Sequence, residues 1–279
     1  MYLPSIESLL KKYRIRPKKH LGQHFLAAAP TLEKIVNALG AKHTDEILEI
    51  GSGLGVMTAM LTQLSNKVYA VEKDRALINI IGQEFGNLKN LQIVAKDFLH
   101  LDFKKDLGQP RFPLKVIGNI PYNISSPILF KLLENKSLIS CAVLTVQHEV
   151  AKRIVARPNT KDYGILAIFA QTQAQCRKLF DIRPTNFIPP PEVDSSCVRL
   201  DFMPPPDLQI DDFNIFQKLV KAAFNQRRKT LRNSLLGSKS LQLPAQRLDL
   251  ALSHLRIDPV RRPETLLIAE YIALANYLA

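Results

Sequence analysis

The four residues Asn119-Ile120-Pro121-Tyr122 have the side chains needed to hold a flat base that carries an amino group. They follow an apolar run, 114–118, which predicts a buried strand. At the end of such a strand, an asparagine oxygen and a backbone carbonyl can accept the two N–H bonds of an exocyclic amine, and a tyrosine ring can stack on the base. Because Pro121 fixes φ, this geometry is set before the base arrives. The pattern favours methylation of an adenine N6, although an ordinary strand-to-helix turn suits the same residues.

A glycine-rich loop upstream, Gly51-Ser52-Gly53-Leu54-Gly55, predicts the site of the methyl donor. An acid, Glu49, precedes the loop, and residues 56–64 after it have helical spacing, so a strand, a turn and a helix follow in that order. Glycines there let the backbone approach a ligand and expose helix N-terminal N–H groups. The spacing Gly-x-Gly-x-Gly differs from the Gly-x-Gly-x-x-Gly of dinucleotide binders and favours S-adenosylmethionine over NAD.

Two further acids end predicted strands. Glu72 ends the strand at 67–72, about 20 residues after the glycine loop, where a ribose-binding carboxylate is expected. Asp97-Phe98 follow the strand at 91–95 and suit the adenine amino group and ring of the cofactor. Each acid alone could be a solvated strand-end residue. Their placement on successive strands favours a cofactor site.

Together these residues resemble the small-subunit ribosomal RNA adenine dimethyltransferase family, in its bacterial KsgA form. Two matching blocks, 187–195 and 224–233, are long and unusual in composition, so the match is much more specific than the glycine loop alone. Two departures are Ile120, where leucine is common, and His24, where asparagine is frequent. The matching blocks run nearly the whole length, at 21–26, 49–55, 72, 97–98, 119–122, 187–195 and 224–233.

The resemblance implies S-adenosyl-L-methionine as the cofactor and two adjacent adenosines near the 3′ end of 16S rRNA, in the small ribosomal subunit or its precursor, as the substrate. Each adenosine would receive two methyl groups on N6, as part of ribosome biogenesis. The resemblance also folds the segment around Gln23 and Phe25 over the cofactor as a lid. The implied cofactor contacts are His24, Leu26, Gly51, Glu72, Asp97 and Asn119.

The expected mechanism is direct displacement, in which the adenine N6 attacks the sulfonium methyl and no metal is needed. The expected catalytic residues are Asn119, Pro121, Tyr122 and Phe187, with Tyr122 and Phe187 on the two faces of a base swung out of its stack. Phe187 lies between Asn186 and a run of prolines, which favours an exposed rim. A core aromatic at the start of a strand would fit the same setting.

The charge of the chain favours a nucleic-acid partner. Its formal net charge is +13, and such charge supplies the sequence-independent part of nucleic-acid binding. One basic run spans 11–20. The other contains the expected RNA-binding residues Arg227, Arg228, Lys229 and Arg232, although a solvated basic face is the alternative for either run.

With 279 residues the chain can hold two domains. Alternating strand and helix patterns predict an α/β fold of the class I S-adenosylmethionine-dependent methyltransferase (Rossmann-like) type over 1–204, with an antiparallel final pair of strands. A small all-helical domain for RNA or ribosome binding is expected over 205–279. The predicted strands are 46–50, 67–72, 91–95, 114–118, 141–147, 174–182 and 196–202, and the predicted C-terminal helices are 211–226, 229–236, 244–255 and 263–278.

Several classes of protein are disfavoured. No apolar run reaches about 18 residues and no cleavable leader is evident, so a cytoplasmic protein that does not bind membranes is expected. The three cysteines are widely spaced, which supports neither a disulfide framework nor a metal site. The protein is expected to be a monomer. The remaining alternatives are a 23S rRNA adenine methyltransferase of the antibiotic-resistance type, a DNA adenine methyltransferase, and a non-catalytic small-subunit assembly factor.

Overall fold

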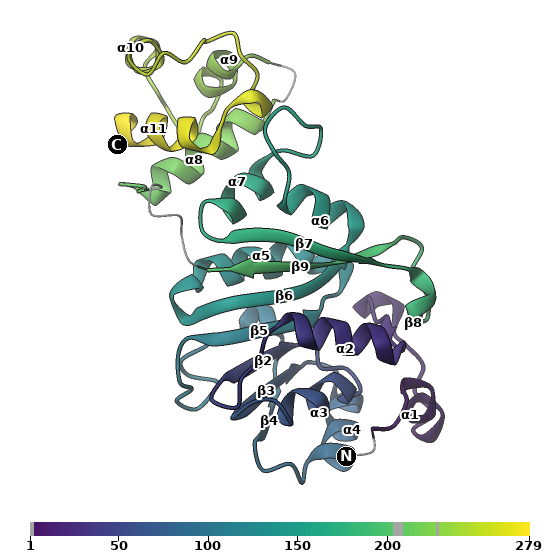
Figure 1. Cartoon of the computed structure of the whole chain (residues 1–279). Helices are drawn as coiled ribbons and strands as arrows, with labels where there is room; N and C mark the ends of the chain where they lie inside the picture. Colours follow the sequence, from purple (N-terminus) through teal and green to yellow (C-terminus); the bar gives the residue numbers. More distant parts are fainter. Residues whose placement is uncertain (1–2, 203–208, 227–228) are drawn as a thin grey trace. The chain divides into compact units, whose positions relative to one another are not determined.

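The computed structural model describes residues 3–202, 209–226 and 229–279. They belong to two compact units, one of residues 1–151 and 175–203 and one of residues 152–174 and 204–279 (Figure 1). The expected division at residue 204 falls in the undescribed stretch 203–208. The segment 152–174 was expected in the first domain, but it belongs to the second unit together with the C-terminal helices.

The first unit is built on a seven-stranded sheet with the order β4-β3-β2-β5-β6-β9-β7. The strands β2 to β6 run parallel, whereas β9 is antiparallel to both of its neighbours, β6 and β7. The expected α/β fold and its antiparallel final strands are therefore confirmed. The strands are β2 (Glu46–Ile50), β3 (Lys67–Glu72), β4 (Leu91–Ala95), β5 (Leu114–Asn119), β6 (Ile139–Gln147), β7 (Gln175–Ile182) and β9 (Ser195–Asp201).

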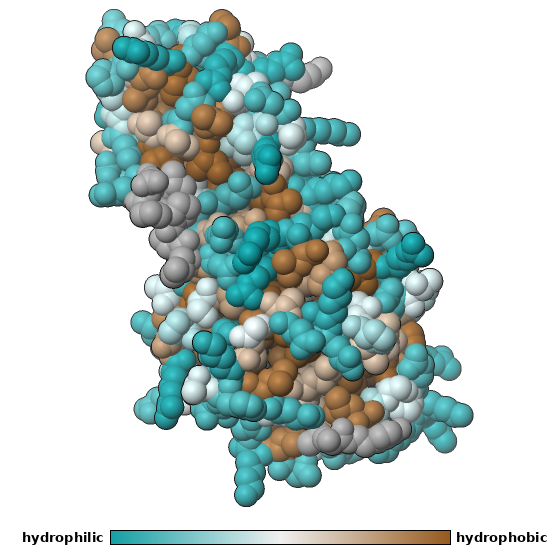
Figure 2. Space-filling model, viewed as in Figure 1, coloured by the Kyte–Doolittle hydropathy of each residue, from teal (hydrophilic) through white to brown (hydrophobic). Residues whose placement is uncertain are grey.

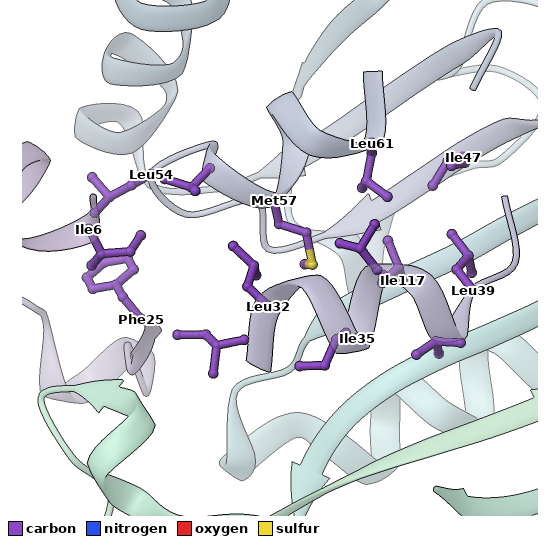
Figure 3. Close-up of a cluster of buried hydrophobic side chains, with 14 of the residues drawn as sticks. Ile6, Phe25, Leu32, Ile35, Leu39, Ile47, Leu54, Met57, Leu61 and Ile117 are labelled. Carbon is purple, nitrogen blue, oxygen red and sulfur yellow. The ribbon is translucent and has the colours of Figure 1, made fainter. Parts of the chain in front are cut away.

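Helices cover this sheet because parallel strands are apolar on both faces. The helices α2 (Ala29–Ala38) and α3 (Val56–Thr62) lie over one face (Figure 1). Between them and the strands lies an apolar core, part of which Figure 3 shows: Leu32, Ile35, Leu39, Ile47, Met57, Leu61 and Ile117. The other helices of this unit are α1 (Ile6–Lys12), α4 (Arg75–Phe85) and α5 (Ser125–Glu134), and α6 (His148–Ile154) crosses into the second unit.

A second, two-stranded sheet joins segments that are far apart in the sequence. The strand β1 (Phe25–Leu26) pairs antiparallel with β8 (Phe187–Ile188), so that Leu26 lies opposite Phe187. This pairing fastens the N-terminal segment to the chain that leads into β9. Short 3-10 turns complete the first unit at η1 (Lys19–Leu21), η2 (Phe98–His100), η3 (Tyr122–Ile124), η4 (Lys136–Leu138) and η5 (Pro184–Asn186).

The second unit is helical, as expected for the C-terminal part. Its helix α7 (Ile165–Gln171) packs on α8 (Phe213–Phe224), with the rings of Phe169 and Phe216 6.0 Å apart. This aromatic contact explains why the segment 152–174 belongs here. The expected helix at 263–278 is divided into η6 (Pro263–Thr265) and α11 (Ile268–Leu278). The remaining helices, α9 (Leu231–Leu236) and α10 (Ala245–His254), lie close to their predicted ranges.

The turn between β2 and α3 depends on glycine at its last position. Gly55 has φ of 81°, and a Cβ there would lie 2.8 Å from Cδ2 of Phe85, closer than packed atoms allow. Gly40 has a similar φ of 59°, but a Cβ at Gly40 would meet no atom of the described residues within 4 Å. An alanine at Gly40 would therefore bear only the cost of the left-handed backbone, whereas an alanine at Gly55 would also have to displace Phe85.

We expect Gly40→Ala to lower the free energy of unfolding by about 1–2 kcal/mol, the cost of a left-handed alanine. Gly55→Ala should lose about 1–3 kcal/mol more, because Phe85 must move. Urea unfolding of both variants measures the difference. Equal stabilities would show that Phe85 yields without cost.

Candidate active site

The main cavity of the first unit opens where the parallel strands end. The space between its walls is about 770 Å³, a volume that includes solvent open to the outside. Its walls come from the carboxyl ends of β2, β3 and β5, from the residues after β4, and from the N-terminal segment. The predicted site residues that line it are His24, Gly51, Glu72, Asp97, Asn119, Pro121 and Tyr122.

Glu72 links the glycine loop to the end of β3. Its Oε2 accepts a hydrogen bond from the Gly53 N–H at 3.0 Å, and its Oε1 accepts the N–H groups of Lys73 and Asp74 at 2.8 and 2.9 Å. Burial raises the pKa of this carboxyl, and the three backbone donors oppose that rise. A carboxylate accepts about four hydrogen bonds, so Oε2 keeps capacity for a ligand hydroxyl.

Asp97 and the lysines near it form another wall of the cavity. Asp97 caps η2 by accepting the Leu99 N–H at 2.9 Å, and its second oxygen lies 3.4 Å from Nζ of Lys73. Lys73 and Lys96 also line the cavity. Neither lysine was predicted as a site residue, although each directly follows a strand that ends at the site.

Asn119, the last residue of β5, contacts the N-terminal segment. Its Nδ2 donates to the backbone carbonyl of His24 at 2.8 Å. This bond uses the donor end of the amide. The acceptor end, Oδ1, is the end that an amino group on a ligand requires.

Tyr122 is held at its hydroxyl group and on one face of its ring. It stacks on the His24 ring, with centroids 5.6 Å apart and planes inclined by 16°. Its Oη lies 2.5 Å from Oγ of Ser195, the first residue of β9. The His24 ring is itself positioned by Nδ1, which donates to the Pro189 carbonyl at 2.8 Å.

The covering segment, which is the N-terminal stretch predicted to be a lid, forms part of the cavity wall. Leu21, Gly22 and Gln23 are part of the lining. Asp74 anchors this segment, because its carboxylate accepts bonds from Lys18 Nζ at 2.8 Å and from Gln23 Nε2 at 2.9 Å. These bonds hold the pKa of Asp74 below its usual range, against the effect of burial. Asp74 was not predicted, since it caps α4 and resembles any helix N-cap in the sequence.

Among the predicted catalytic and cofactor-binding residues, Phe187 and Leu26 do not line the main cavity. Phe187 is only 2% exposed and belongs to the apolar core, so the prediction that it lies on an exposed rim is wrong. The reason is its pairing with Leu26, which turns the ring inward instead of toward solvent. Leu26 is also buried and lines a smaller neighbouring cavity.

That smaller cavity contains buried polar oxygens. Glu49 accepts a hydrogen bond from Thr58 at 2.5 Å, and burial raises the pKa of Glu49 to about 8. Its Oε1, with Oγ of Ser52 and Oγ1 of Thr145, has no hydrogen-bond partner among the described residues. Gly51 and Asn119 line both cavities.

The expected RNA-binding residues are in the second unit. Arg227 and Arg228 lie outside the described residues. Arg232 forms a bidentate ion pair with Asp249, at 2.6 Å from Nε and 2.8 Å from Nη2. Lys229 is exposed. Within this basic block, Arg232 therefore has a structural role, through its ion pair with Asp249.

The described ranges 3–202, 209–226 and 229–279 contain neither a cluster of metal ligands nor a membrane-spanning helix. Within them, no three His, Cys, Asp or Glu side chains are grouped so that they could hold a metal ion. Over the same ranges, no helix has the length and apolar character to cross a membrane.

The family of the chain follows from this site together with comparison with known proteins. The pattern of the family described as ribosomal RNA adenine dimethylase matches residues 14–279. The chain belongs to this family. The resemblance on which the sequence analysis relied is thereby confirmed.

Two relatives of this adenine dimethylase are named ribosomal RNA small subunit methyltransferase A. The protein from Alkaliphilus oremlandii is 39% identical over 276 residues, which cover 98% of this chain and 96% of that protein. The protein from Chlorobium luteolum is 45% identical over 232 residues, which cover 83% of this chain and 82% of that protein.

Solved structures agree with the fold of this adenine dimethylase. A dimethyladenosine transferase from Plasmodium falciparum is similar with a TM-score of 0.77 at 28% identity, over 90% of this chain and 96% of that one. The 23S rRNA methyltransferase ErmE gives a TM-score of 0.69 at 24% identity, over 91% of this chain and 99% of that one. At that identity, ErmE shows a shared fold only.

Ile120 and His24, the two residues that differ from the common family residues, both fit their surroundings in the structure. Ile120 is buried, and its N–H donates to the Thr145 carbonyl at 3.1 Å. His24 stacks on Tyr122 and contacts Pro189. Both residues therefore fit the turn that carries Asn119 and Tyr122.

Proposed function

We propose that this chain transfers methyl groups from S-adenosylmethionine to N6 of two adjacent adenosines near the 3′ end of 16S rRNA. One observation carries the proposal: a single cavity contains both the acids Glu72 and Asp97 and the turn from Asn119 to Tyr122. The first pair suits a nucleoside cofactor, and the turn suits a second adenine. The names of the relatives, small subunit methyltransferase A, support the 16S substrate.

The cofactor half of the cavity fits S-adenosylmethionine. Glu72 would accept a ribose hydroxyl through Oε2, and Asp97 would accept the adenine amino group beside Phe98. The loop from Gly51 to Gly53 lets the backbone approach the methionine part closely. When bound, S-adenosylmethionine supplies a methyl group on a positively charged sulfur, which is a good leaving group.

The other half of the cavity would hold the target adenine after it leaves its stack. Oδ1 of Asn119 and a backbone carbonyl of the turn would accept the two N6 protons, which directs the N6 lone pair toward the methyl group. His24 covers one face of Tyr122, so we assign the base to the opposite face. Phe187 would support this turn from the core, because its buried ring does not line the cavity.

The chemical step then needs only positioning and electrostatic stabilisation. As N6 forms its bond to the methyl carbon, positive charge develops on N6 and strengthens its bond to Oδ1 of Asn119. The proton becomes acidic only after transfer and can pass to water. A second round on the same N6 gives the dimethylated base.

The deciding experiment is a methyl-transfer assay with labelled cofactor, followed by mass analysis of the nucleosides. Its substrates are unmethylated 30S particles, naked 16S RNA, 23S RNA and duplex DNA. Dimethyladenosine in the small-subunit RNA alone is the expected result. Label in 23S RNA or DNA would favour one of the rival methyltransferases, and binding to particles without any transfer would favour an assembly factor. With a small-subunit substrate, we also propose that the protein acts in the cytoplasm.

Basic side chains would supply much of the affinity for rRNA. The chain has 38 lysines and arginines against 25 acids, and hydrophilic residues cover much of the face in Figure 2. Arg232 is engaged with Asp249. The neighbouring cations at 227–229 are therefore the better candidates for phosphate contacts.

We expect the double change Arg227→Ala and Arg228→Ala to weaken particle binding and to flatten its salt dependence. The log–log slope should fall by about 0.7–0.9 for each lost phosphate contact, without a change in cofactor affinity. The matched control is Lys104→Ala with Lys105→Ala, which removes the same charge from an exposed turn of the first unit. If the arginine variant keeps the full slope, the phosphate contacts must be sought in the run at 11–20.

A further inference from the structure

The turn that carries Tyr122 does not fix the direction of the aromatic ring by itself. Tyr122 begins η3, a single 3-10 turn of three residues. Stacking costs less entropy when the ring is already held in position before the base arrives. The orientation of the ring must therefore come from contacts outside the turn.

One of these contacts is the hydrogen bond between Oη of Tyr122 and Oγ of Ser195, with the oxygens 2.5 Å apart. Ser195 is 0% exposed. It begins β9 and is paired on one side with Gln147 of β6 and on the other with Ile182 of β7. A side chain on a strand held by two neighbours is a rigid anchor.

The segment between β8 and β9 fixes the ring a second time. The carbonyl of Pro189 accepts a hydrogen bond from Nδ1 of His24, whose ring covers one face of Tyr122. The tyrosine is thus held at its hydroxyl end by Ser195 and on one face by His24. Both contacts depend on the same stretch of chain, 189–195.

We propose that Ser195 is a positioning residue for methyl transfer: it holds the hydroxyl end of Tyr122 and so fixes the long axis of the ring, while the His24 stack restrains the ring plane for stacking on the target adenine. The inference rests on the proposed function, because it needs a base in the cavity. Ser195 does not touch the reacting atoms and acts only through the tyrosine hydroxyl. The consequence is that Ser195 and Tyr122 Oη form one functional unit.

The experiment compares Ser195→Ala, Tyr122→Phe and the double variant on unmethylated 30S particles. Single-turnover methyl transfer at subsaturating RNA should fall about 3- to 10-fold in each single variant, the range for one lost hydrogen bond. The double variant should be no slower than either single variant, since both changes remove the same contact. With 2-aminopurine at the target position, all three variants should show less of the fluorescence rise that accompanies base unstacking.

Ser196→Ala is the matched control. Ser196 is equally buried on the same strand, but it faces the other way, where its Oγ donates to Asp181 at 2.6 Å and lies 3.0 Å from Nδ1 of His148. It should leave the fluorescence rise unchanged. Tyr122→Phe removes the same bond without altering the sheet, so the test stands even if Ser195→Ala folds poorly.

Two outcomes would overturn the inference. One is an effect of Ser195→Ala that is as large in the Tyr122→Phe background as in the wild type. The other is a loss of fluorescence response in Ser196→Ala equal to that in Ser195→Ala. Failure of the wild type to methylate any adenosine of the particle would instead remove the proposed function, and with it the inference, so the two failures are distinguishable.

Discussion

Replacement of Asn119 by alanine is expected to lower the rate of methyl transfer by about 10²- to 10³-fold, the usual cost of one oriented group that stabilises developing charge. Its Oδ1 would act mainly as N6 becomes positive, so the loss should fall on the transition state. Binding of the ribosomal particle should be nearly unchanged, because that affinity comes largely from phosphate contacts.

The structure adds a requirement to this test. Asn119 also donates to the carbonyl of His24 at 2.8 Å, so its removal loosens the covering segment as well. Single-turnover rates must therefore be measured at saturating cofactor, with cofactor affinity determined separately. Asn123→Ala is the matched control, since Asn123 is exposed in the same turn and does not line the cavity. A near-normal rate for Asn119→Ala would show that another group stabilises N6.

The second large effect is expected for Glu72→Ala. It should weaken cofactor binding by about 10- to 100-fold, because a charge-assisted hydrogen bond to the ribose contributes about 1.5–3 kcal/mol. The same change removes the acceptor of the Gly53, Lys73 and Asp74 N–H groups. Some loss of stability should accompany the loss of affinity, while binding of RNA stays constant.

Isothermal titration with the cofactor measures this effect, and thermal unfolding verifies that the variant is folded. Glu84→Ala is the control, because Glu84 is another acid of the first unit that accepts from Tyr13 and lies outside the cavity. Unchanged cofactor affinity in folded Glu72→Ala would exclude Glu72 as the ribose acceptor.

The pH dependence of cofactor binding should carry the same signature. Burial raises the pKa of Glu72, so this carboxyl gains its proton at a higher pH than an exposed glutamate does. The protonated form loses acceptor strength. Affinity should therefore decline as pH falls through the raised pKa, and Glu72→Ala should lack this decline.

Much of the lining of the main cavity could be predicted from the sequence. Gly51, Glu72, Asp97 and Asn119 each lie at or just after the end of a predicted parallel strand. Since parallel strands in one sheet end at the same edge, four positions spread over about 70 residues must meet there. The strand pattern alone thus determined the position of the cavity, and the side chains in it indicated its chemistry.

Other features depended on contacts between distant segments, which local patterns do not specify. Phe187 was expected on a rim, but the pairing of β8 with β1 buries it. The segment 152–174 has the local pattern of the first unit, yet Phe169 packs on Phe216 and assigns it to the second. Each of these outcomes depends on a partner more than 40 residues away.

The sequence by itself determined the family, the order of the strands along the chain and which strand-end residues meet in the main cavity, because these follow from local periodicity and from residue types at strand ends. Only the tertiary structure decided how Tyr122 is oriented, through Ser195 and His24, and how Asp74 anchors the covering segment. The physical reason is that a hydrogen bond or a ring contact requires two side chains to meet within a few ångströms. A sequence specifies that approach only through the packing of the whole unit.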